Sequence, residues 1–375
     1  MTNRQRLRAV LTYEKCDRLP VVHFGYWKEL LEKWVSEGYL MPYEIMNLHD
    51  GSPNDHLIGE KLGFDFNYYT TYQDLSGFSS LWPAFEPKRL KEYPDGSYEY
   101  LNEDGAIVLQ KEGLCSIPPE IGHLLVDRAS WEEHYLPRLQ YSEDRFDAVA
   151  LQKLAVESES RSEPLGLYCK SLFGQIRNWM GVEGISYLYA DDEGLYDEII
   201  NTVGELTYQT TRRLLLSGVQ FDFAHFWEDI CFKNGPLVIP SVFEEKVGPH
   251  YRRITELIKS HGVEIISLDC DGFIDALLPI WLENGVNTMF PIEVGTWNAS
   301  IAPWREKYGC RVRGVGGANK HVFSADKISV DAEIERLKPL VALGGFLPCP
   351  DHRLPPDAKW ELVQYYCDRM LRVFS

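Results

Sequence analysis

Short apolar runs alternate with helical patterns through most of the chain, from about Pro164 to its end. The apolar runs predict strands at Leu165–Tyr168, Phe221–Phe226, Glu264–Leu268, Asn287–Ile292, Arg311–Val315 and Gly345–Pro348. Apolar residues at helical spacing predict helices at Leu195–Leu216, Ser241–Ser260, Phe273–Asn284 and Asp357–Phe374. Strands that alternate with helices are usually parallel and joined by right-handed crossovers, so the pattern favours an α/β fold.

The first half of the chain is less regular. Met1–Lys15 predicts an N-terminal helical extension, and Arg18–Phe24 and Gly63–Tyr69 predict the first two strands. The turn signals Pro94-Asp95-Gly96 and Glu103-Asp104-Gly105 flank Ser97–Leu101, with Ala106–Gln110 beyond, and predict a small β-hairpin insertion at about residues 86–115. The chain has no GxGxxG and no GxxxxGKS/T motif that follows a strand and opens a helix. We therefore predict a single (β/α)8 TIM barrel over residues 1–375 rather than a dinucleotide-binding sheet.

Polar and ionisable residues gather where the predicted strands end. In a parallel barrel, reactive groups lie at the carboxyl ends of strands and in the loops that follow. Asp229 and Asn319 could equally cap helices, and His225 could equally be a buried core histidine. Glu293 directly follows an apolar run and should face the mouth of the barrel. The candidate site residues are His23, His225, Trp227, Glu228, Asp229, Asp269, Asp271, Glu293, Asn319, Lys320, Asp351 and His352.

The most informative stretch runs from Ile265 to Gly272 and carries two carboxylates one residue apart. Because side chains alternate along a strand, Asp269 and Asp271 should point to one face, with Leu268 and Cys270 on the other. Like charges this close repel unless a cation lies between them, which favours a metal ion or a positively charged substrate. The alternative is that one aspartate caps a helix and the other is solvated.

Four of these residues, Asp269, Asp271, Glu293 and His352, are the candidate metal ligands. Carboxylates with one imidazole suit zinc in an open site, or manganese or magnesium. Cys349 is an alternative ligand. Aromatic residues near the expected mouth could wall a pocket for a flat or methylated ligand, or could simply be core: Tyr26, Trp27, Trp179, Trp227, Trp297 and Trp304.

The composition of the chain limits which classes of partner and which cellular compartment we expect. A formal net charge of −18 and the lack of a basic run argue against a nucleic-acid partner. No apolar stretch approaches the ~20 residues of a membrane span, and no apolar signal core follows the N-terminus. The 8 cysteines are scattered without CxxC pairs, so we expect a reducing, cytoplasmic location.

Motifs spread over nearly the whole chain resemble the uroporphyrinogen decarboxylase superfamily, in particular its methyltransferase-like branch. The order and spacing of the motifs carry the resemblance. They are Asn3-Arg4 to Arg18-Leu19-Pro20, Leu172-Phe173-Gly174 to Gly184, Trp227-Glu228-Asp229 to Asn234-Gly235-Pro236, Asp269-Cys270-Asp271-Gly272, Pro291-Ile292-Glu293, Arg305 to Gly309, Gly316 to Lys320, and Gly344 to His352.

The resemblance implies a single (β/α)8 barrel with its site at the carboxyl face. It implies either cofactor-free decarboxylation of a tetrapyrrole or methyl transfer involving a corrinoid, usually carried on a partner protein. The decarboxylases have an Arg-rich loop after the first strand, but this chain has His23 to Lys28 there, which disfavours a polycarboxylate substrate. The thiol methyltransferases have His-x-Cys and a later Cys as zinc ligands, where this chain has Asp269, Asp271 and His352.

The leading hypothesis is a corrinoid-dependent methyltransferase, specifically an O-demethylase for a small methoxylated compound. A metal, most simply zinc, would polarise the ether oxygen, with Glu228 or Asp229 as the acid. The substrate-binding candidates are His23, Trp179, His225, Trp227, Asn319 and Lys320. The expected partners are a methyl donor and a corrinoid carrier protein, with a homodimer left open. The alternatives are a metal-independent decarboxylase and a non-catalytic tetrapyrrole- or corrinoid-binding protein.

Overall fold

The centre of the protein is a seven-stranded sheet in which every neighbouring pair is parallel. The computed structural model describes residues 1–111 and 118–375. The strand order is β15-β14-β13-β12-β9-β8-β3. Their bounds are β3 (Thr71–Tyr72), β8 (Gly166–Tyr168), β9 (Phe223–Trp227), β12 (Ile266–Asp269), β13 (Thr288–Ile292), β14 (Arg313–Ala318) and β15 (Phe346–Pro350). The predicted parallel α/β architecture is therefore confirmed.

A second, two-stranded parallel sheet pairs β1 (Val22–His23) with β2 (Phe66–Asn67). The chain from β2 to β3 contributes to both sheets, and β1 contacts β15. Tyr26 follows β1 and Leu354 follows β15. Within residues 1–111 and 118–375, an isolated parallel β-bridge between these two residues joins the two segments. The arrangement is compatible with a TIM-type barrel, without a continuous ladder that closes it.

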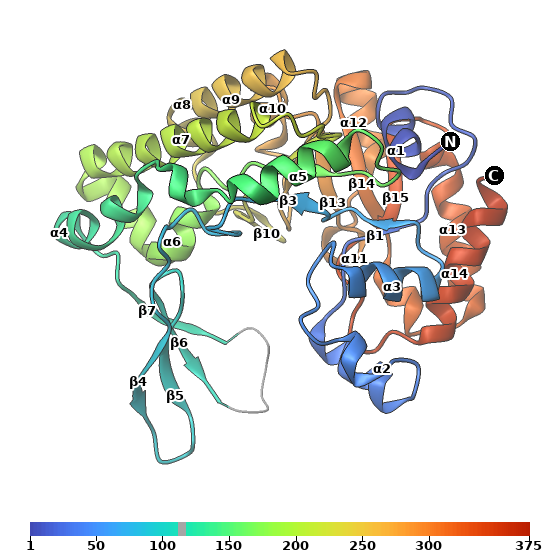
Figure 1. The fold of residues 1–375 in the computed structure, drawn as a ribbon, viewed down its shortest axis with the longest axis horizontal. Helices are drawn as coiled ribbons and strands as arrows, with labels where there is room; N and C mark the ends of the chain where they lie inside the picture. The colour runs from blue at the N-terminus through green and yellow to red at the C-terminus, as the bar shows by residue number, and fades with distance from the viewer. Residues whose placement is uncertain (112–117) are drawn as a thin grey trace.

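Helices flank the central sheet on both sides (Figure 1). Helices α7 to α10 lie along one side and α12 to α14 along the other. The bounds of the helices are α1 (Asn3–Leu11), α2 (Lys28–Ser36), α3 (Pro53–Leu62), α4 (Arg128–Ser130), α5 (Ala148–Ser158), α6 (Gly174–Asp191), α7 (Glu193–Leu215), α8 (Pro240–Lys246), α9 (Gly248–Ser260), α10 (Leu278–Glu283), α11 (Val294–Trp297), α12 (Ile301–Tyr308), α13 (Lys327–Val341) and α14 (Trp360–Val373).

Proline explains two differences from the predicted helices. The helix predicted at Ser241–Ser260 is two helices, α8 and α9, because Pro249 fits only the first turn of a helix and cannot continue α8. The helix predicted at Phe273–Asn284 begins only at Leu278, with Pro279 in its first turn. In each case the apolar periodicity was right, but it did not locate the helix start.

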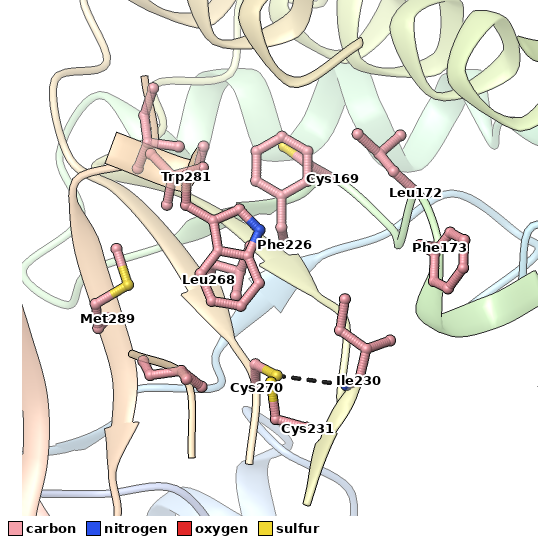
Figure 2. Packing of buried hydrophobic residues seen from close by; sticks show 14 of the residues in the cluster. Cys169, Leu172, Phe173, Phe226, Ile230, Cys231, Leu268, Cys270, Trp281 and Met289 are labelled. Atoms are coloured by element: carbon pink, nitrogen blue, oxygen red, sulfur yellow. Dashed lines mark hydrogen bonds between the residues drawn. The ribbon is translucent and has the colours of Figure 1, made fainter. Parts of the chain in front are cut away.

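The core has two parts. The larger part lies between the sheet and its helices, and Figure 2 shows Phe226, Leu268, Cys270 and Trp281 packed there. The smaller part lies inside the curve of the sheets and includes Phe24, Phe223 and Phe290. Leu7, Val10 and Leu11 of α1 belong to this inner part, together with residues at the starts of strands. Helix α1 therefore covers the amino-terminal end of the strands and leaves the carboxyl end for a site.

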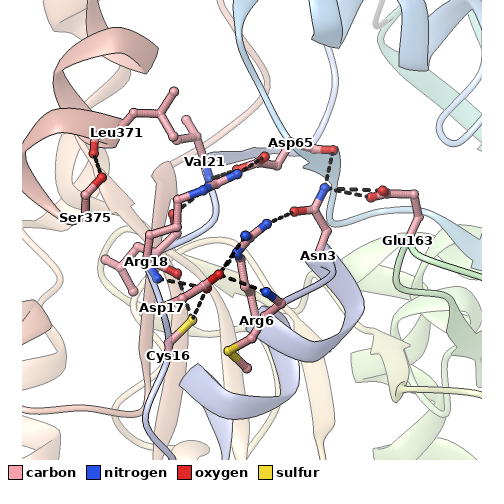
Figure 3. Close-up of polar contacts among 12 residues, drawn as sticks. Asn3, Arg6, Cys16, Asp17, Arg18, Val21, Asp65, Glu163, Leu371 and Ser375 are labelled. Carbon is pink, nitrogen blue, oxygen red and sulfur yellow. Dashed lines mark hydrogen bonds and ion pairs between the residues drawn. The ribbon is translucent and has the colours of Figure 1, made fainter.

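Paired charges anchor the N-terminal segment (Figure 3). Both nitrogens of the Arg18 fork donate to Asp65, each at 2.6 Å, next to β2. Arg6 on α1 donates to both carboxylate oxygens of Asp17 at 2.8 Å. Bidentate pairs of this kind fix direction as well as distance. They hold α1 and the start of β1 against the second strand.

A four-stranded antiparallel sheet projects from the body of the molecule (Figure 1). Its strands are β4 (Lys88–Glu92), β5 (Tyr98–Leu101), β6 (Ala106–Gln110) and β7 (Glu120–His123). The pair β5–β6 is the predicted hairpin. Strand β4 adds a strand within the predicted range, and β7 extends the insertion beyond its predicted end at residue 115. Residues 112–115 of the predicted insertion lie outside the described residues. Within the described part of the chain, no helix combines the length and apolar character that crossing a membrane requires.

Candidate functional site

A cavity of about 410 Å³ lies at the carboxyl ends of β8, β9 and β12. This is the position where parallel α/β barrels place their reactive groups. Its volume suits a small molecule, since ligand pockets usually span roughly 300–1,000 Å³. The lining residues are Phe24, Trp27, Tyr69, Phe78, Ser79, Asp104, Tyr168, Gln175, Asn178, Trp227, Asp229, Asp269, Asp271, His352 and Arg353.

Strand alternation brings the strand-end residues into this cavity. Asp269, the last residue of β12, is in register with Trp227, the last residue of β9. Both line the cavity. Leu268 and Cys270 lie in the outer core on the opposite face, as the alternation predicted (Figure 2).

Asp269 is a buried carboxylate with an incomplete set of partners. It is 8% exposed, and the Tyr69 hydroxyl donates to its Oδ2. Its Oδ1 has no hydrogen-bond partner among residues 1–111 and 118–375. Burial, and then the neighbouring charge of Asp271, hold the pKa of Asp269 well above its usual value. The Oδ1 oxygen is open to water or to a ligand in the cavity.

Asp271 and Asp229 add two more carboxylates to the same wall. Asp271 lies 3.4 Å from Nε2 of His352, whose ring stacks on Trp27 at 5.6 Å with an angle of 9°. Burial and the charge of Asp271 raise the pKa of Asp229 to about 6. Arg177, 3.5 Å from Asp229, partly offsets that rise. Asp229 therefore titrates within the range in which an enzyme can use it as an acid.

A buried lysine shapes the loop that carries Phe78 and Ser79 to the cavity. The ammonium of Lys170 donates to Oδ1 of Asp74 at 2.7 Å and to the carbonyl of Ser79 at 3.1 Å. It also donates to Oγ of Ser76 at 3.0 Å and to the carbonyl of Gly77. Burial lowers the pKa of Lys170, and Asp74 opposes that shift. Lys170 thus acts as the fixed centre around which this loop folds.

Glu228, predicted as an alternative acid, is fully buried away from the cavity lining. Its carboxylate accepts hydrogen bonds from the backbone N–H of Leu172 (2.9 Å), Phe173 (3.0 Å) and Gly174 (2.6 Å). The hydroxyls of Ser171 (2.9 Å) and Tyr251 also donate to it. These donors occupy the carboxylate and fix the start of α6.

The four predicted metal ligands do not fit a metal in this arrangement. Glu293 is 4% exposed and accepts from the Gly272 N–H at 2.6 Å and the Thr296 hydroxyl at 2.8 Å. Asp269 is bonded to Tyr69, and Asp271 lies 3.4 Å from His352. In the part of the chain that the structure describes, no group of three or more His, Cys, Asp or Glu side chains could hold a metal ion. Cys349, the alternative ligand, is buried in the inner core.

The remaining predicted substrate-binding residues do not line the cavity. Fully buried His225 bonds Ser267 at 2.6 Å below it, and burial lowers the pKa of His225 to about 3. His23 packs against Phe64 on the outer face, where burial lowers its pKa to about 3. Trp179 is a core residue. Asn319 caps the 3-10 helix Lys320–Phe323, whose Lys320 N–H donates to Asp351 at 2.9 Å.

Several cavity residues were missed from the sequence. Phe24 was detectable, because Val22 and Phe24 share the inner face of the first strand and leave His23 on the other. Tyr69 and Tyr168 end predicted strands and could have been chosen by position alone. Asp104 comes from the β5–β6 turn and is held by Ser79 at 2.8 Å, a long-range contact without a local signal.

Comparisons with known proteins support the fold. A methyltransferase from Methanosarcina mazei is similar to this chain over 100% of both chains, with 13% sequence identity and a TM-score of 0.60. A B12-independent methionine synthase from Listeria monocytogenes matches over 60% of this chain and 70% of its own, with 12% identity and a TM-score of 0.37, which is too weak to support an argument. No family model and no curated protein sequence matches the chain. At these identities the likeness shows a shared fold and leaves the chemistry to be argued from the site.

Proposed function

We propose that the protein is a methyltransferase that removes a methyl group from a small compound bound in the cavity of about 410 Å³. The observation that carries the proposal is the cavity itself. It is small, walled by aromatic rings and carboxylates, and located at the carboxyl ends of parallel strands. The likeness in fold to a methyltransferase, and the family resemblance of the sequence motifs, support the same reaction class. The proposal includes closure of the two sheets into one (β/α)8 barrel.

The proposed acceptor is a reduced corrinoid delivered by a carrier protein. The corrinoid supplies a strong nucleophile when the carrier docks. Because the carrier brings it as a co-substrate, we assign no residue of this chain to its binding. The residues of the chain bind the methyl donor, hold its methyl group at the mouth and exclude water from the reacting atoms.

Two donor classes fit a small site of this kind. A methyl ether leaves as an alkoxide or phenoxide, so it needs a proton at the departing oxygen. Asp229, whose pKa is raised to about 6, could supply that proton. A methylated ammonium leaves as a neutral amine and needs no acid. The metal-assisted form of the reaction is not part of the proposal, because the ligand set does not fit a metal.

The decarboxylase alternative is disfavoured by charge. Four aspartates line the cavity, namely Asp104, Asp229, Asp269 and Asp271. The fork of Arg353, which also lines it, is bound to Asp50 at 3.1 and 2.5 Å. A substrate with many carboxylates would be repelled by such a lining.

Methyl transfer to a reduced corrinoid carrier, measured across a panel of methyl ethers and methylated ammonium compounds, tests the proposal. We expect turnover of at least one donor and loss of at least about tenfold in rate for Asp269→Asn. Glu183→Gln, on the exposed side of α6, is the matched control and should keep full activity. If no donor is turned over with the carrier present, the proposal is wrong.

A further inference from the structure

We propose that the cavity binds a methylated ammonium cation and that this cation is the methyl donor. The inference names the substrate class of the same site, so its donor role rests on the proposed function. Three independent features of the cavity carry it: the sign of its charge, the rings that wall it, and two polar atoms of its lining that have no protein partner.

The lining of the cavity is acidic. Four aspartates face two basic residues, Arg353 and His352. Arg353 is bound to Asp50, which lies outside the lining, and its charge also acts on Asp269, so one guanidinium faces four carboxylates. His352 lies 3.4 Å from Asp271, and Arg177, outside the lining, lies 3.5 Å from Asp229. Asp104 and Asp269 have no ion pair among residues 1–111 and 118–375. A ligand that carries positive charge relieves the repulsion among these carboxylates.

Aromatic rings form most of the remaining wall. Six rings line the cavity, those of Phe24, Trp27, Tyr69, Phe78, Tyr168 and Trp227. The faces of aromatic rings attract cations through their quadrupole, and methylated ammonium groups suit such cages because their charge is spread over apolar methyl groups. An inorganic cation would need oxygen ligands in tight geometry instead. Rings and carboxylates together therefore select an organic cation.

Two side chains of the lining are largely buried, but each has a polar atom that lacks a protein partner and is open to the cavity. Tyr168 is 2% exposed, and its hydroxyl has no hydrogen-bond partner within residues 1–111 and 118–375. The Oδ1 atom of Asp269 likewise has no hydrogen-bond partner among these residues. Neither atom is fully buried, so water can bond to each in the free protein, and a ligand that enters the cavity can replace that water. Asp269 would face the ammonium group, and Tyr168 would bond a polar group elsewhere on the ligand.

The transfer step is balanced without an added acid. The bond between the methyl carbon and nitrogen breaks, and its electron pair stays on nitrogen. The product is a neutral tertiary amine, and the methyl group, without that pair, is taken by the two-electron nucleophile of the reduced corrinoid. No proton is needed, so the step does not require any carboxylate of the lining to act as an acid.

Calorimetric titration of the full-length protein with choline and with its neutral isostere, 3,3-dimethylbutan-1-ol, tests the ligand class directly. The two probes have nearly the same shape and differ in the charge at the central atom. At constant ionic strength we expect choline to bind at least about tenfold more tightly, a difference that cation–π attraction and one carboxylate can supply. Equal binding of the two probes, or no binding of choline up to its solubility, would overturn the inference.

Substitutions separate the contributions of charge and rings. Asp271→Asn should weaken choline about tenfold and leave the neutral isostere unchanged, while Glu183→Gln should change neither. Trp227→Leu should weaken choline severalfold more than Trp227→Phe, which keeps an aromatic face. If a variant fails to fold, the two probes on the unsubstituted protein still decide the inference.

The transfer assay distinguishes failure of the inference from failure of the proposed function. Turnover of choline supports both. Turnover of a methyl ether, but not of choline or tetramethylammonium, overturns the donor assignment and leaves the methyltransferase standing. Selective binding of choline without transfer from any donor supports the ligand class and refutes both the donor role and the proposed function.

Discussion

Glu228 and Asp269 are both buried carboxylates at the ends of neighbouring strands, yet their surroundings differ completely. Glu228 accepts hydrogen bonds from Ser171, Leu172, Phe173, Gly174 and Tyr251. Asp269 accepts one, from Tyr69, and its second oxygen faces a cavity. Burial raises the pKa of both groups, so the pKa direction alone does not tell them apart.

What separates the two carboxylates is the number of donors that satisfy them. A fully bonded carboxylate stabilises the fold and has little capacity left for a ligand. A carboxylate with one partner destabilises the fold and is retained for what it binds. The comparison assigns Glu228 to structure and Asp269 to function, and it predicts opposite effects of substitution at the two positions.

Glu228→Ala should have the largest effect. It leaves three backbone N–H groups and two hydroxyls without their acceptor, so we expect the free energy of unfolding to fall by about 4 kcal/mol. Urea denaturation measures this change. Glu228→Gln keeps the shape and some acceptors, and should fall between this variant and the unsubstituted protein. A loss below about 1 kcal/mol for Glu228→Ala would break the comparison.

Lys170→Met tests a fully bonded cation by the same reasoning. It leaves Asp74 buried without its counter-ion and removes the centre of the loop that carries Phe78 and Ser79. We expect a loss of about 3 kcal/mol in the free energy of unfolding, together with weaker choline binding. Lys153→Met, on the exposed face of α5, is the control. An unchanged free energy of unfolding would show that a fully hydrogen-bonded buried charge does not stabilise this fold.

Asp269→Asn should act in the opposite direction on stability. The pKa of Asp269 is raised on folding, so the folded environment disfavours the ionised form of this carboxylate. Removing the charge should leave the free energy of unfolding unchanged or raise it by about 1 kcal/mol, while donor binding weakens at least about tenfold. Thermal denaturation and calorimetry on the same preparation measure both quantities. A variant that is less stable and still binds the donor would contradict the assignment.

The pH dependence of choline binding sharpens the comparison further. The folded-state pKa of Asp229 is about 6, raised from 3.8 by burial and by Asp271, and Arg177 and His352 oppose that rise. Its carboxylate is charged above that pKa, so choline affinity should fall as pH drops through about 6. The effect on the free energy of unfolding has the opposite direction. Because the pKa of Asp229 is raised on folding, its contribution to that free energy falls as the pH rises from about 4 to 6. Asp229→Asn should flatten the binding profile, and an unchanged profile would exclude Asp229 from the site.

The smallest expected effect is that of metal removal. Glu293 is bonded to Gly272 and Thr296, so the predicted ligand set is not assembled. Treatment with a chelator, followed by dialysis, should leave donor binding and methyl transfer unchanged. Loss of activity that returns on adding zinc would restore the metal-assisted reaction and contradict the arrangement described here.

The sequence predicted the fold better than it predicted the roles of side chains. Alternation of strands and helices gave the parallel sheet, because local periodicity reflects which face is buried. Strand starts and helix starts shifted where proline or pairing geometry intervened, as at Pro249 and Pro279. Of the β4–β7 sheet only β5 and β6 were predicted as strands. Strand β4 is exposed along its whole length and therefore has no apolar pattern that would predict it.

The sequence predicted which side chains lie at the ends of the strands, but not which of them are already fully hydrogen-bonded within the protein. Trp227, Asp229, Asp269, Asp271 and His352 were predicted at the site and line the cavity. Glu228 and Glu293 were predicted by the same reasoning, but their donors come from Leu172 to Gly174 and from Gly272, which only the folded chain brings near. Neighbours in sequence, such as Glu228 and Asp229, can therefore serve different purposes.

A crystal structure of the protein with choline would show where the cation binds. We expect the ammonium nitrogen within about 6 Å of ring centroids in the cavity, beside Asp269 or Asp271. The choline hydroxyl should lie within hydrogen-bond reach of a lining polar group such as Tyr168. An empty cavity at saturating choline, or choline bound only elsewhere, would contradict the account.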